Sequence, residues 1–541
     1  MQFAERNGLL HDEQNGFRRS RSCEDHCFVL SSIIRNRKAN NLSTFVGLID
    51  FKKAFDCVDR TLLMYKLLRL GVGGKFYKNL KNIYSQCETA INLNGYISNF
   101  FACDYGVRQG DCLSSTLFIL FIDDLISDLK NGSVGIRNEY FNLQCLLYAD
   151  DLTLISESER DLQCMLDILS IWCAKWRMRV NISKTAVIHF RNRRVNQTKF
   201  LFRYNSETVK IVDRYKYLGL IFHEHLDYRI TSKVLAESGG RALGAVYSRY
   251  KENNGFGYAT YTKMYNSGVV PILDYGSSIW GFEEHDCMNS IQNRALRLFL
   301  GVHRFTPNCA INGDMGWTTC KIRRYGNMIR MWNRLIKMNS NRLTKKVFMW
   351  DKSLSNTNWS NEIAQIFDKI SVRDNFYFDR IVDNFYAKQK LFQLYRNEWR
   401  VKSNATPKLR TYISYKDDFC IEAYVKLIHN RGQRSIVAQF RSGVLPLALE
   451  TGRYNNIPVE YRLCKYCNFN LLEDEKHFLF YCTAYNDIRK TLEDKATEIE
   501  PNYVVLADEL KFKLLMSEVL IKHTAVFLYN AYDKRKSLTY V

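Results

Sequence analysis

Two short apolar runs, at 143–148 and 152–155, flank the tripeptide Ala149-Asp150-Asp151. Apolar runs separated by a tight polar turn predict a β-hairpin, here with two carboxylates at its tip. A further buried strand is predicted over 45–49, and Asp50 follows it directly. Residues 1–190 alternate such runs with helical stretches, which is typical of an α/β sheet. Because open α/β sheets place chemistry at strand ends, we expect the three aspartates to meet at one sheet edge.

Carboxylates that meet at one point repel each other unless a cation lies between them. Mg²⁺ prefers carboxylate oxygens together with substrate phosphates. Two such ions about 4 Å apart can activate an attacking 3′-oxygen and stabilise a leaving pyrophosphate. The Asp-Asp pair alone says little, because it recurs at 123–124 and 417–418 without flanking apolar runs. We expect those two pairs on helix or loop surfaces.

Charge and composition narrow the class of protein. The 541 residues include 78 Lys and Arg against 56 Asp and Glu, a formal charge of +22, with 14% aromatic residues. This balance favours a partner with a phosphate backbone, although a basic surface can also serve solubility alone. No apolar stretch of about 18 residues is present, so we expect no membrane span. Without a recognisable signal peptide, we expect the protein in the nucleus and cytoplasm, with mostly reduced cysteines.

From about residue 230 to 430 the pattern predicts mostly helices, and arginines recur along them. These side chains either grip a nucleic-acid backbone or form solvated helix faces. The recurring arginines are Arg294, Arg297, Arg304, Arg323, Arg324, Arg330 and Arg334.

A group of cysteines and a histidine lies near the C-terminal end, with the spacing C-x₂-C-x₉-H-x₄-C. It consists of Cys464, Cys467, His477 and Cys482, the last two on a predicted helical stretch at 475–481. Three thiolates and one imidazole suit a tetrahedral, closed Zn²⁺ site. A redox Cys-x₂-Cys pair is the competing interpretation, and the additional His and Cys favour zinc.

Around the aspartates the sequence resembles the reverse transcriptases of LINE-type, non-LTR retrotransposons. Five segments are similar to their motifs A to E, in that order, and one to the segment upstream of motif A. They are 48–56 (LIDFKKAFD), 106–114 (GVRQGDCLS), 148–151 (YADD), 181–185 (NISKT), 215–219 (YKYLG) and, upstream, 13–18 (EQNGFR). The Cys/His group, with the residues before it, resembles the C-terminal CCHC segment of the same elements.

The resemblance implies roles for individual residues. Asp50, Asp150 and Asp151, with the carbonyl of Phe51, would hold two Mg²⁺ ions. Phe55 would be the steric gate that excludes ribonucleotides.

Three further motif residues and a lysine complete the expected site. Gln109 and Gly110 would form the loop under the templating pair, where a side chain on Gly110 would obstruct the close approach. Arg108 would contact the phosphate backbone. Lys184 would be the general acid for pyrophosphate, which requires hydrogen-bond reach.

The resemblance also implies an α+β, right-hand polymerase acting with template RNA, primer DNA and deoxynucleoside triphosphates. We expect partial fingers and an α/β palm over 1–200, a primer-grip hairpin and helical thumb over 201–330, a helical linker over 331–430, and a zinc-binding domain over 431–541. Since the chain begins just before the 13–18 segment, we expect an element truncated at its N-terminus and without an endonuclease domain. Two alternatives remain: an inactive remnant that only binds nucleic acid, and a group II intron maturase.

Overall fold

The computed structural model describes residues 1–85, 87–108, 110–354 and 358–539, and these form two compact units. The first unit comprises Met1–Thr231, Gly276–Trp280 and Met328–Val382. The second comprises Ser232–Tyr275, Gly281–Asn327 and Asp383–Val541. Both units are therefore built from segments that are not consecutive in the sequence.

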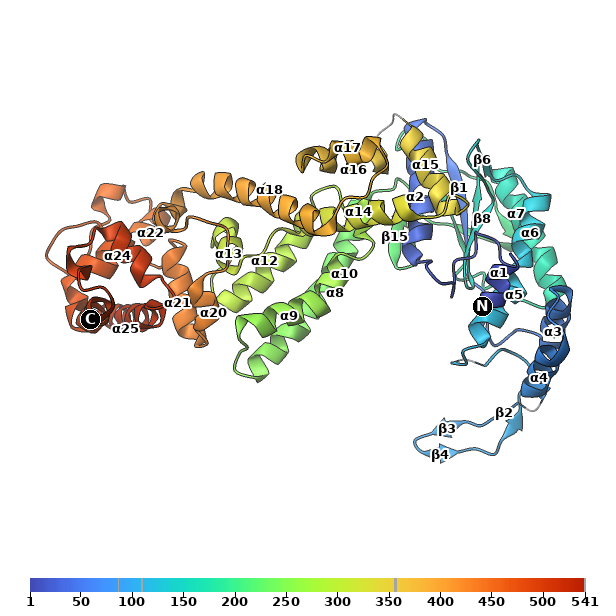
Figure 1. Ribbon diagram of the computed structural model, residues 1–541, viewed down its shortest axis with the longest axis horizontal. Coiled ribbons are helices and arrows are strands. Elements are labelled where there is room, and N and C mark those ends of the chain that lie inside the picture. Colours follow the sequence, from blue (N-terminus) through green and yellow to red (C-terminus); the bar gives the residue numbers. More distant parts are fainter. Residues whose placement is uncertain (86, 109, 355–357, 540–541) are drawn as a thin grey trace. The chain divides into compact units, whose positions relative to one another are not determined.

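A five-stranded sheet forms the centre of the first unit (Figure 1). The strand order is β13 (Lys210–Ile211), β10 (Ala186–Phe190), β1 (Thr44–Ile49), β9 (Asp151–Ser156) and β8 (Cys145–Tyr148). All neighbours are antiparallel except β10 and β13. Every residue of the central strand β1 is buried, as expected for a strand covered on both faces.

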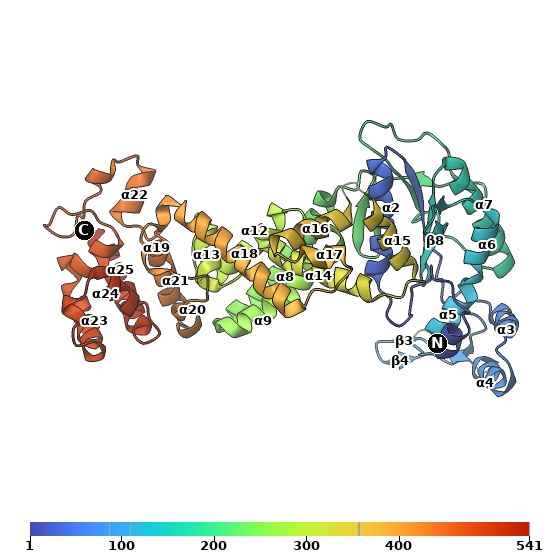
Figure 2. The same ribbon diagram turned by 45° about the horizontal axis from the view of Figure 1, so that its top comes forward.

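Helices cover the two faces of this sheet. Helices α6 (Asp124–Gly132) and α7 (Glu159–Trp176) lie on one side, and α2 (Cys23–Ala39) and α15 (Leu343–Ser353) on the other (Figures 1 and 2). Because α15 packs against α2, twelve of the seventeen residues of α2 are buried. The late segment Met328–Val382 thus completes the core of the first unit.

Shorter elements surround the sheet. A hairpin made of β2 to β5, between Glu88 and Ala102, projects from the unit (Figure 1), and its strands expose their side chains except for Thr89, which is half-buried. The remaining helices of the first unit are α1 (Gln2–Arg6), α3 (Arg60–Arg69), α4 (Gly74–Ser85), α5 (Ser114–Ile122), α11 (Ser277–Trp280), α16 (Trp359–Lys369) and α17 (Arg373–Tyr377). The other strands pair as β6 (Ile136–Arg137) with β7 (Asn142–Leu143), β11 (Arg203–Tyr204) with β12 (Glu207–Thr208), and β14 (Arg214–Tyr217) with β15 (Leu220–His223).

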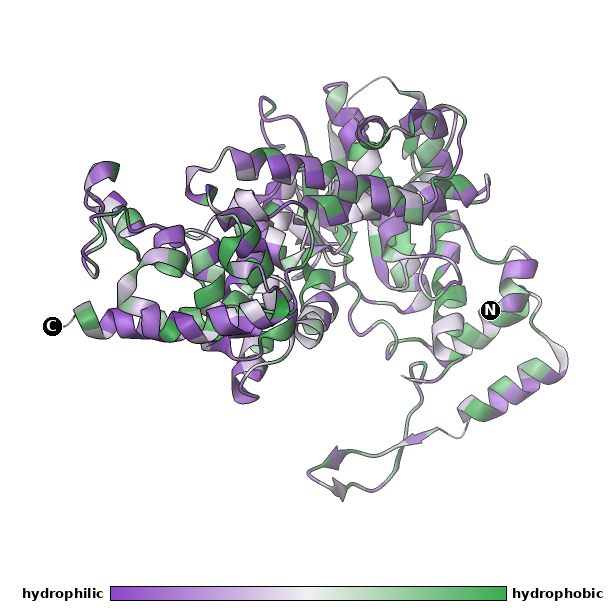
Figure 3. Ribbon diagram, turned by 60° about the vertical axis from the view of Figure 1, so that its left-hand side comes forward, coloured by the Kyte–Doolittle hydropathy of each residue, from purple (hydrophilic) through white to green (hydrophobic). Residues whose placement is uncertain are grey.

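The described part of the second unit is helical. Its C-terminal helix α25 alternates hydrophilic and hydrophobic bands (Figure 3), as an amphipathic helix against a core should. Two helices are shared between the units, since α8 (Tyr228–Glu252) begins and α14 (Cys320–Lys337) ends in the first unit. The other longer helices of the second unit are α9 (Tyr258–Gly268), α12 (Asp286–Leu300), α13 (Asn308–Met315), α18 (Asn384–Asn404), α21 (Arg431–Arg441), α23 (Asn486–Ile499), α24 (Asp508–Leu515) and α25 (Ile521–Thr539).

The elements expected from the sequence are present. The predicted strand, hairpin and helical middle are confirmed by β1, by β8 and β9, and by the helices between residues 228 and 404. The surface position expected for Asp123 is wrong: its side chain is buried and accepts a hydrogen bond from the backbone N–H of His11 at 3.1 Å. Among the described residues, no helix is long and apolar enough to cross a membrane.

Candidate active site

The sheet brings the three predicted aspartates to one edge. Ile49, the last residue of β1, pairs with Leu152 of β9, so Asp50 and Asp151 follow at adjacent positions on neighbouring antiparallel strands. Tyr148 pairs with Asp151 across the β8–β9 hairpin, which leaves Ala149 and Asp150 as the turn. The convergence follows from strand register alone, since all three residues lie at strand ends.

The carboxylates influence each other's protonation. Burial, followed by the charges of Asp150 and Asp50, raises the pKa of Asp151 to about 6. Burial also raises the pKa of Asp150, and Asp50 adds to this effect. The Asp50 carboxylate also accepts a hydrogen bond of 2.9 Å from the side-chain amide of Asn181. The edge therefore concentrates negative charge that a bound cation would stabilise.

A buried glutamine holds the turn that carries Asp150. Ala149 has a φ of 57°, in the left-handed region that non-glycine residues rarely adopt. The Gln14 side chain is fully buried; its Oε1 accepts from the Ala149 N–H at 3.0 Å, and its Nε2 donates to the Ala149 carbonyl at 3.3 Å. Gly16 lies so close that an added Cβ would be 2.2 Å from the Ala149 nitrogen.

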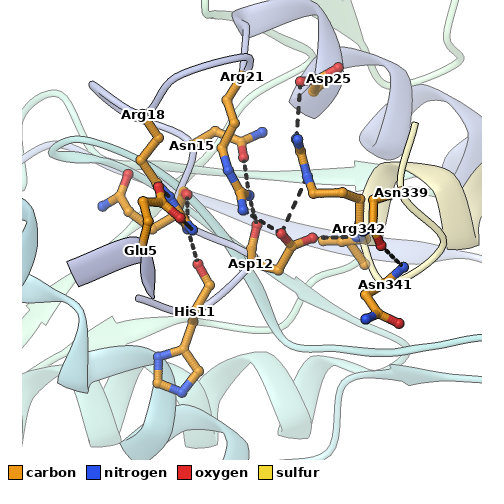
Figure 4. Close-up of polar contacts among 12 residues, drawn as sticks. Glu5, His11, Asp12, Asn15, Arg18, Arg21, Asp25, Asn339, Asn341 and Arg342 are labelled. Carbon is orange, nitrogen blue, oxygen red and sulfur yellow. Dashed lines mark hydrogen bonds and ion pairs between the residues drawn. The ribbon is translucent and has the colours of Figure 1, made fainter. Parts of the chain in front are cut away.

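Ion pairs fix the segment to which Gln14 belongs (Figure 4). Arg18 donates to the carbonyls of His11 and Gln14, at 2.5 and 2.9 Å. Asp12 pairs with Arg21 at 2.6 Å and with Arg342 at 3.3 Å. Since Arg342 belongs to the Met328–Val382 segment, a late part of the chain supports the backbone that holds the turn.

Sequence reasoning did not find these supporting roles. The sequence marks Gln14, Gly16 and Arg18 only as parts of the 13–18 motif. Their contacts with the Ala149 backbone and with their own segment leave no periodic pattern in the sequence. Gln14 lies in the polar stretch 11–16, so the composition around it gives no sign that its side chain is buried.

The aromatic residue of the predicted gate, Phe55, packs among other aromatic rings. Phe55 stacks on Phe118 with ring centroids 4.3 Å apart and meets Phe17 edge-on at 6.1 Å. Its side chain is half-buried. Phe51 forms an isolated bridge with Val180, which orients its backbone next to Asp50.

The motif around Gly110 shows a different reason for its glycine. A Cβ on Gly110 would meet nothing within 4 Å, but its φ is +87°, which strains other residues. Glycine at position 110 is therefore required by the backbone conformation and not by close packing against another described part of the protein. The exposed Arg108 donates to the sulfur of Cys87 at 2.9 and 3.0 Å. Gln109 lies outside the described residues.

Lys184 is exposed, in the turn that precedes β10. Its backbone carbonyl accepts a hydrogen bond of 3.2 Å from the Tyr215 hydroxyl. Burial and the nearby charges of Asp50 and Asp151 raise the pKa of Tyr215. Tyr215 thus contacts the Lys184 backbone and lies near the charges of Asp50 and Asp151. The role of Lys184 as a general acid stays a prediction.

Comparison with known proteins assigns this part of the chain. Residues 2–222 match the reverse transcriptase (RNA-dependent DNA polymerase) family. This segment is a LINE-type reverse transcriptase domain. It contains the aspartate edge, the Gln14 segment and the β14–β15 hairpin as far as Phe222.

Three relatives illustrate the similarity of the reverse transcriptase domain. The Pol polyprotein of the type-2 retrotransposable element R2DM of Drosophila melanogaster is 27% identical over 216 residues, 39% of this chain and 20% of the relative. The RNA-directed DNA polymerase from the mobile element jockey of the same species is 23% identical over 312 residues, 55% of this chain and 33% of the relative. The transposon TX1 149 kDa protein of Xenopus laevis is 28% identical over 214 residues, 39% of this chain and 16% of the relative. The chain thus spans a third or less of these relatives.

Outside the reverse transcriptase domain, the Cys/His group comes together as predicted. The ligand atoms of Cys464, Cys467, His477 and Cys482 all lie within 4.8 Å of one another. His477 opens a short π-helix, His477–Tyr481, that ends directly before Cys482. The buried guanidinium of Arg489 donates to the carbonyl of Cys482 at 2.7 Å, which fixes the last ligand. Three sulfurs and one imidazole in this arrangement fit a tetrahedral Zn²⁺ ion.

Proposed function

We propose that the protein is an RNA-directed DNA polymerase of a non-LTR retrotransposon. It extends a primer DNA from its 3′-hydroxyl with deoxynucleoside triphosphates on a template RNA. The observation that carries the proposal is the convergence of Asp50, Asp150 and Asp151 at one sheet edge inside a reverse transcriptase domain. Similarity to retrotransposon polymerases supports this over a group II intron maturase, and the three aspartates support catalysis over binding alone.

The metal ligands in this proposal are Asp50, the carbonyl of Phe51, Asp150 and Asp151. The raised pKa values of Asp150 and Asp151 support this ligand set, because they reflect neighbouring negative charges at partly buried positions. Bound Mg²⁺ ions supply activation of the 3′-oxygen and stabilisation of the leaving pyrophosphate. The chain's part is to hold the carboxylates in place, with Asn181 orienting Asp50 and Gln14 fixing the turn.

Other residues act on the substrates. The Phe55 ring excludes the ribose 2′-hydroxyl, and its stacking on Phe118 supports a fixed position for such a gate. Gln109 and Gly110 lie under the templating pair, and Arg108 contacts the nucleic-acid backbone. Lys184 donates a proton to pyrophosphate.

We further propose a right-hand layout with partial fingers and palm over 1–200, a primer grip and thumb over 201–330, a linker over 331–430 and a CCHC domain over 431–541. A structural Zn²⁺ ion on Cys464, Cys467, His477 and Cys482 holds the last of these. The protein acts in the nucleus and cytoplasm, where its template and primer occur.

Primer extension tests the proposal. Purified full-length chain receives an RNA template, an annealed DNA primer, deoxynucleotides and Mg²⁺. We expect extension in the wild type, none with Asp150→Ala, and wild-type extension with Asp533→Ala, which removes an exposed carboxylate of α25. Absence of extension in the wild type, or its persistence in Asp150→Ala, would overturn the proposal.

A further inference from the structure

The arginines of the helical region divide into two groups. Arg323 pairs with Asp274 at 2.9 Å, and the buried Arg324 donates to the backbone carbonyls of Gly281 and Glu283. These side chains hold helices together. Arg294, Arg297 and Arg304 instead line a hollow of about 460 Å³ in the second unit, joined there by Arg431.

The four arginines of this hollow, the arginine pocket, have no acidic partner. Within the described part of the chain, no carboxylate lies within ion-pair distance of any of them, and none lines the hollow. Arg297 donates to the Thr306 carbonyl at 2.9 Å and to Asn308 Oδ1 at 2.6 Å. Its buried Nε has no hydrogen-bond partner, and burial without an opposing acid lowers its pKa. Uncompensated positive charge in a concave site is what an anion would stabilise.

The arginine pocket adjoins two further hollows, and residues of α12 line all three. A hollow of about 740 Å³ shares Ser290 and Arg294 with it and adds Lys233 and Arg241. A third hollow of about 390 Å³ shares Ser290 with both and adds Lys402. The three hollows contain seven cationic side chains against the two acids Glu237 and Asp286.

An aromatic ring accompanies the cations. Phe305 is 56% exposed, and the Arg304 guanidinium lies 4.7 Å above its ring. Grooves that follow single strands combine positive charge for the backbone with exposed rings on which bases stack. The small volume of each hollow suits one phosphate with its sugar, whereas a duplex would contact the rims only.

We propose that the arginine pocket and the two adjoining hollows bind the phosphodiester backbone of single-stranded RNA. This site is formed by the second unit alone. The choice of RNA rests on the proposed function, but binding at this site does not depend on catalysis.

The test measures RNA binding by full-length protein, using the anisotropy of a fluorescent 20-nucleotide RNA over a series of salt concentrations. The variant is Arg294→Gln with Arg304→Gln, because neither side chain holds the fold through a carboxylate or carbonyl. The control is Arg249→Gln with Lys495→Gln, an equal loss of charge at residues paired with Glu252 and Glu498.

We expect the Kd of the variant to rise about tenfold near 0.1 M salt. The slope of log K against log salt should fall by about 1.4, since each phosphate contact on a single strand contributes about 0.7. The control should keep the wild-type slope. Phe305→Ala should weaken RNA binding about tenfold without changing the slope, because stacking involves no counterion.

A variant that behaves like the control would overturn the proposal. So would an equal or larger loss with a blunt RNA–DNA duplex, because that would assign the site to double-stranded nucleic acid. Unfolding midpoints equal to that of the wild type exclude misfolding as the cause. Asp150→Ala should leave the salt slope unchanged, so failure of catalysis and failure of this site give different results.

Discussion

Replacing Gln14 tests whether the turn beside Asp150 is held by a side chain from another segment. Gln14→Ala removes the acceptor of two backbone N–H groups, from Gly16 at 2.8 Å and Ala149 at 3.0 Å. Leaving a buried donor unsatisfied costs about 1–3 kcal/mol. We therefore expect the free energy of unfolding to fall by about 3–5 kcal/mol, with the weaker bond to the Ala149 carbonyl and the cavity included.

The effect on catalysis has a separate origin. The left-handed conformation of Ala149 costs about 1–2 kcal/mol, which the Gln14 bonds offset. Without them the turn relaxes and shifts Asp150, and a displacement of about 1 Å in a catalytic group lowers the rate about 100-fold. Single-turnover primer extension measures this loss, and urea unfolding measures the loss of stability.

Two further variants separate positioning from stability. Gln144→Ala removes an equally buried glutamine just before β8, at the opposite end from the turn, and should lower stability without lowering kcat. Gln14→Glu presents an oxygen to the Ala149 carbonyl in place of the amide donor. Its protonated form can donate there, so its activity relative to wild type should recover as the pH is lowered. A Gln14→Ala protein with kcat within about threefold of wild type would refute the reasoning.

Three other outcomes follow from the geometry. Because the pKa of Asp151 is raised to about 6, the folded, metal-free protein binds a proton at Asp151 more strongly than the unfolded chain does. The unfolding midpoint of the protein should therefore rise as the pH falls from about 7 to 5, and it should rise less in Asp151→Asn. Elemental analysis should find one zinc per chain, lost together with C-terminal helicity in Cys467→Ser, and a full zinc content in that variant would contradict the ligand set. Gly16→Ala should destabilise the protein by more than Gly110→Ala in urea unfolding, because only the former places a Cβ against the Ala149 backbone; the reverse order would refute the contact.

The aspartate edge was predictable because its determinants are local. Each strand is a short apolar run, each aspartate is at a strand end, and antiparallel register then places them together. The Cys/His group was equally predictable, since four candidate ligands within 19 residues leave few other arrangements.

The supporting contacts were not predictable in the same way. Gln14 meets Ala149 across 135 residues of sequence, and a buried amide has no periodicity that would mark it. The arginines show the same limit: Arg324 is fully buried on carbonyls and Arg294 is exposed in a hollow, although both lie in basic helical sequence. What distinguishes them is the neighbouring helix, which a single segment of sequence does not contain.

The packing of α15 on α2 also has a consequence for biosynthesis. The ribosome completes the matched segment 2–222 well before it adds Arg342, which contacts Asp12, and Phe348 and Trp359, which are buried in the same unit. Until then the nascent chain carries α2 with its apolar face uncovered. The first unit is therefore complete only once the chain has been made as far as Val382, although its reverse transcriptase segment is made first. A fragment ending after β15 should need a chaperone to stay in solution.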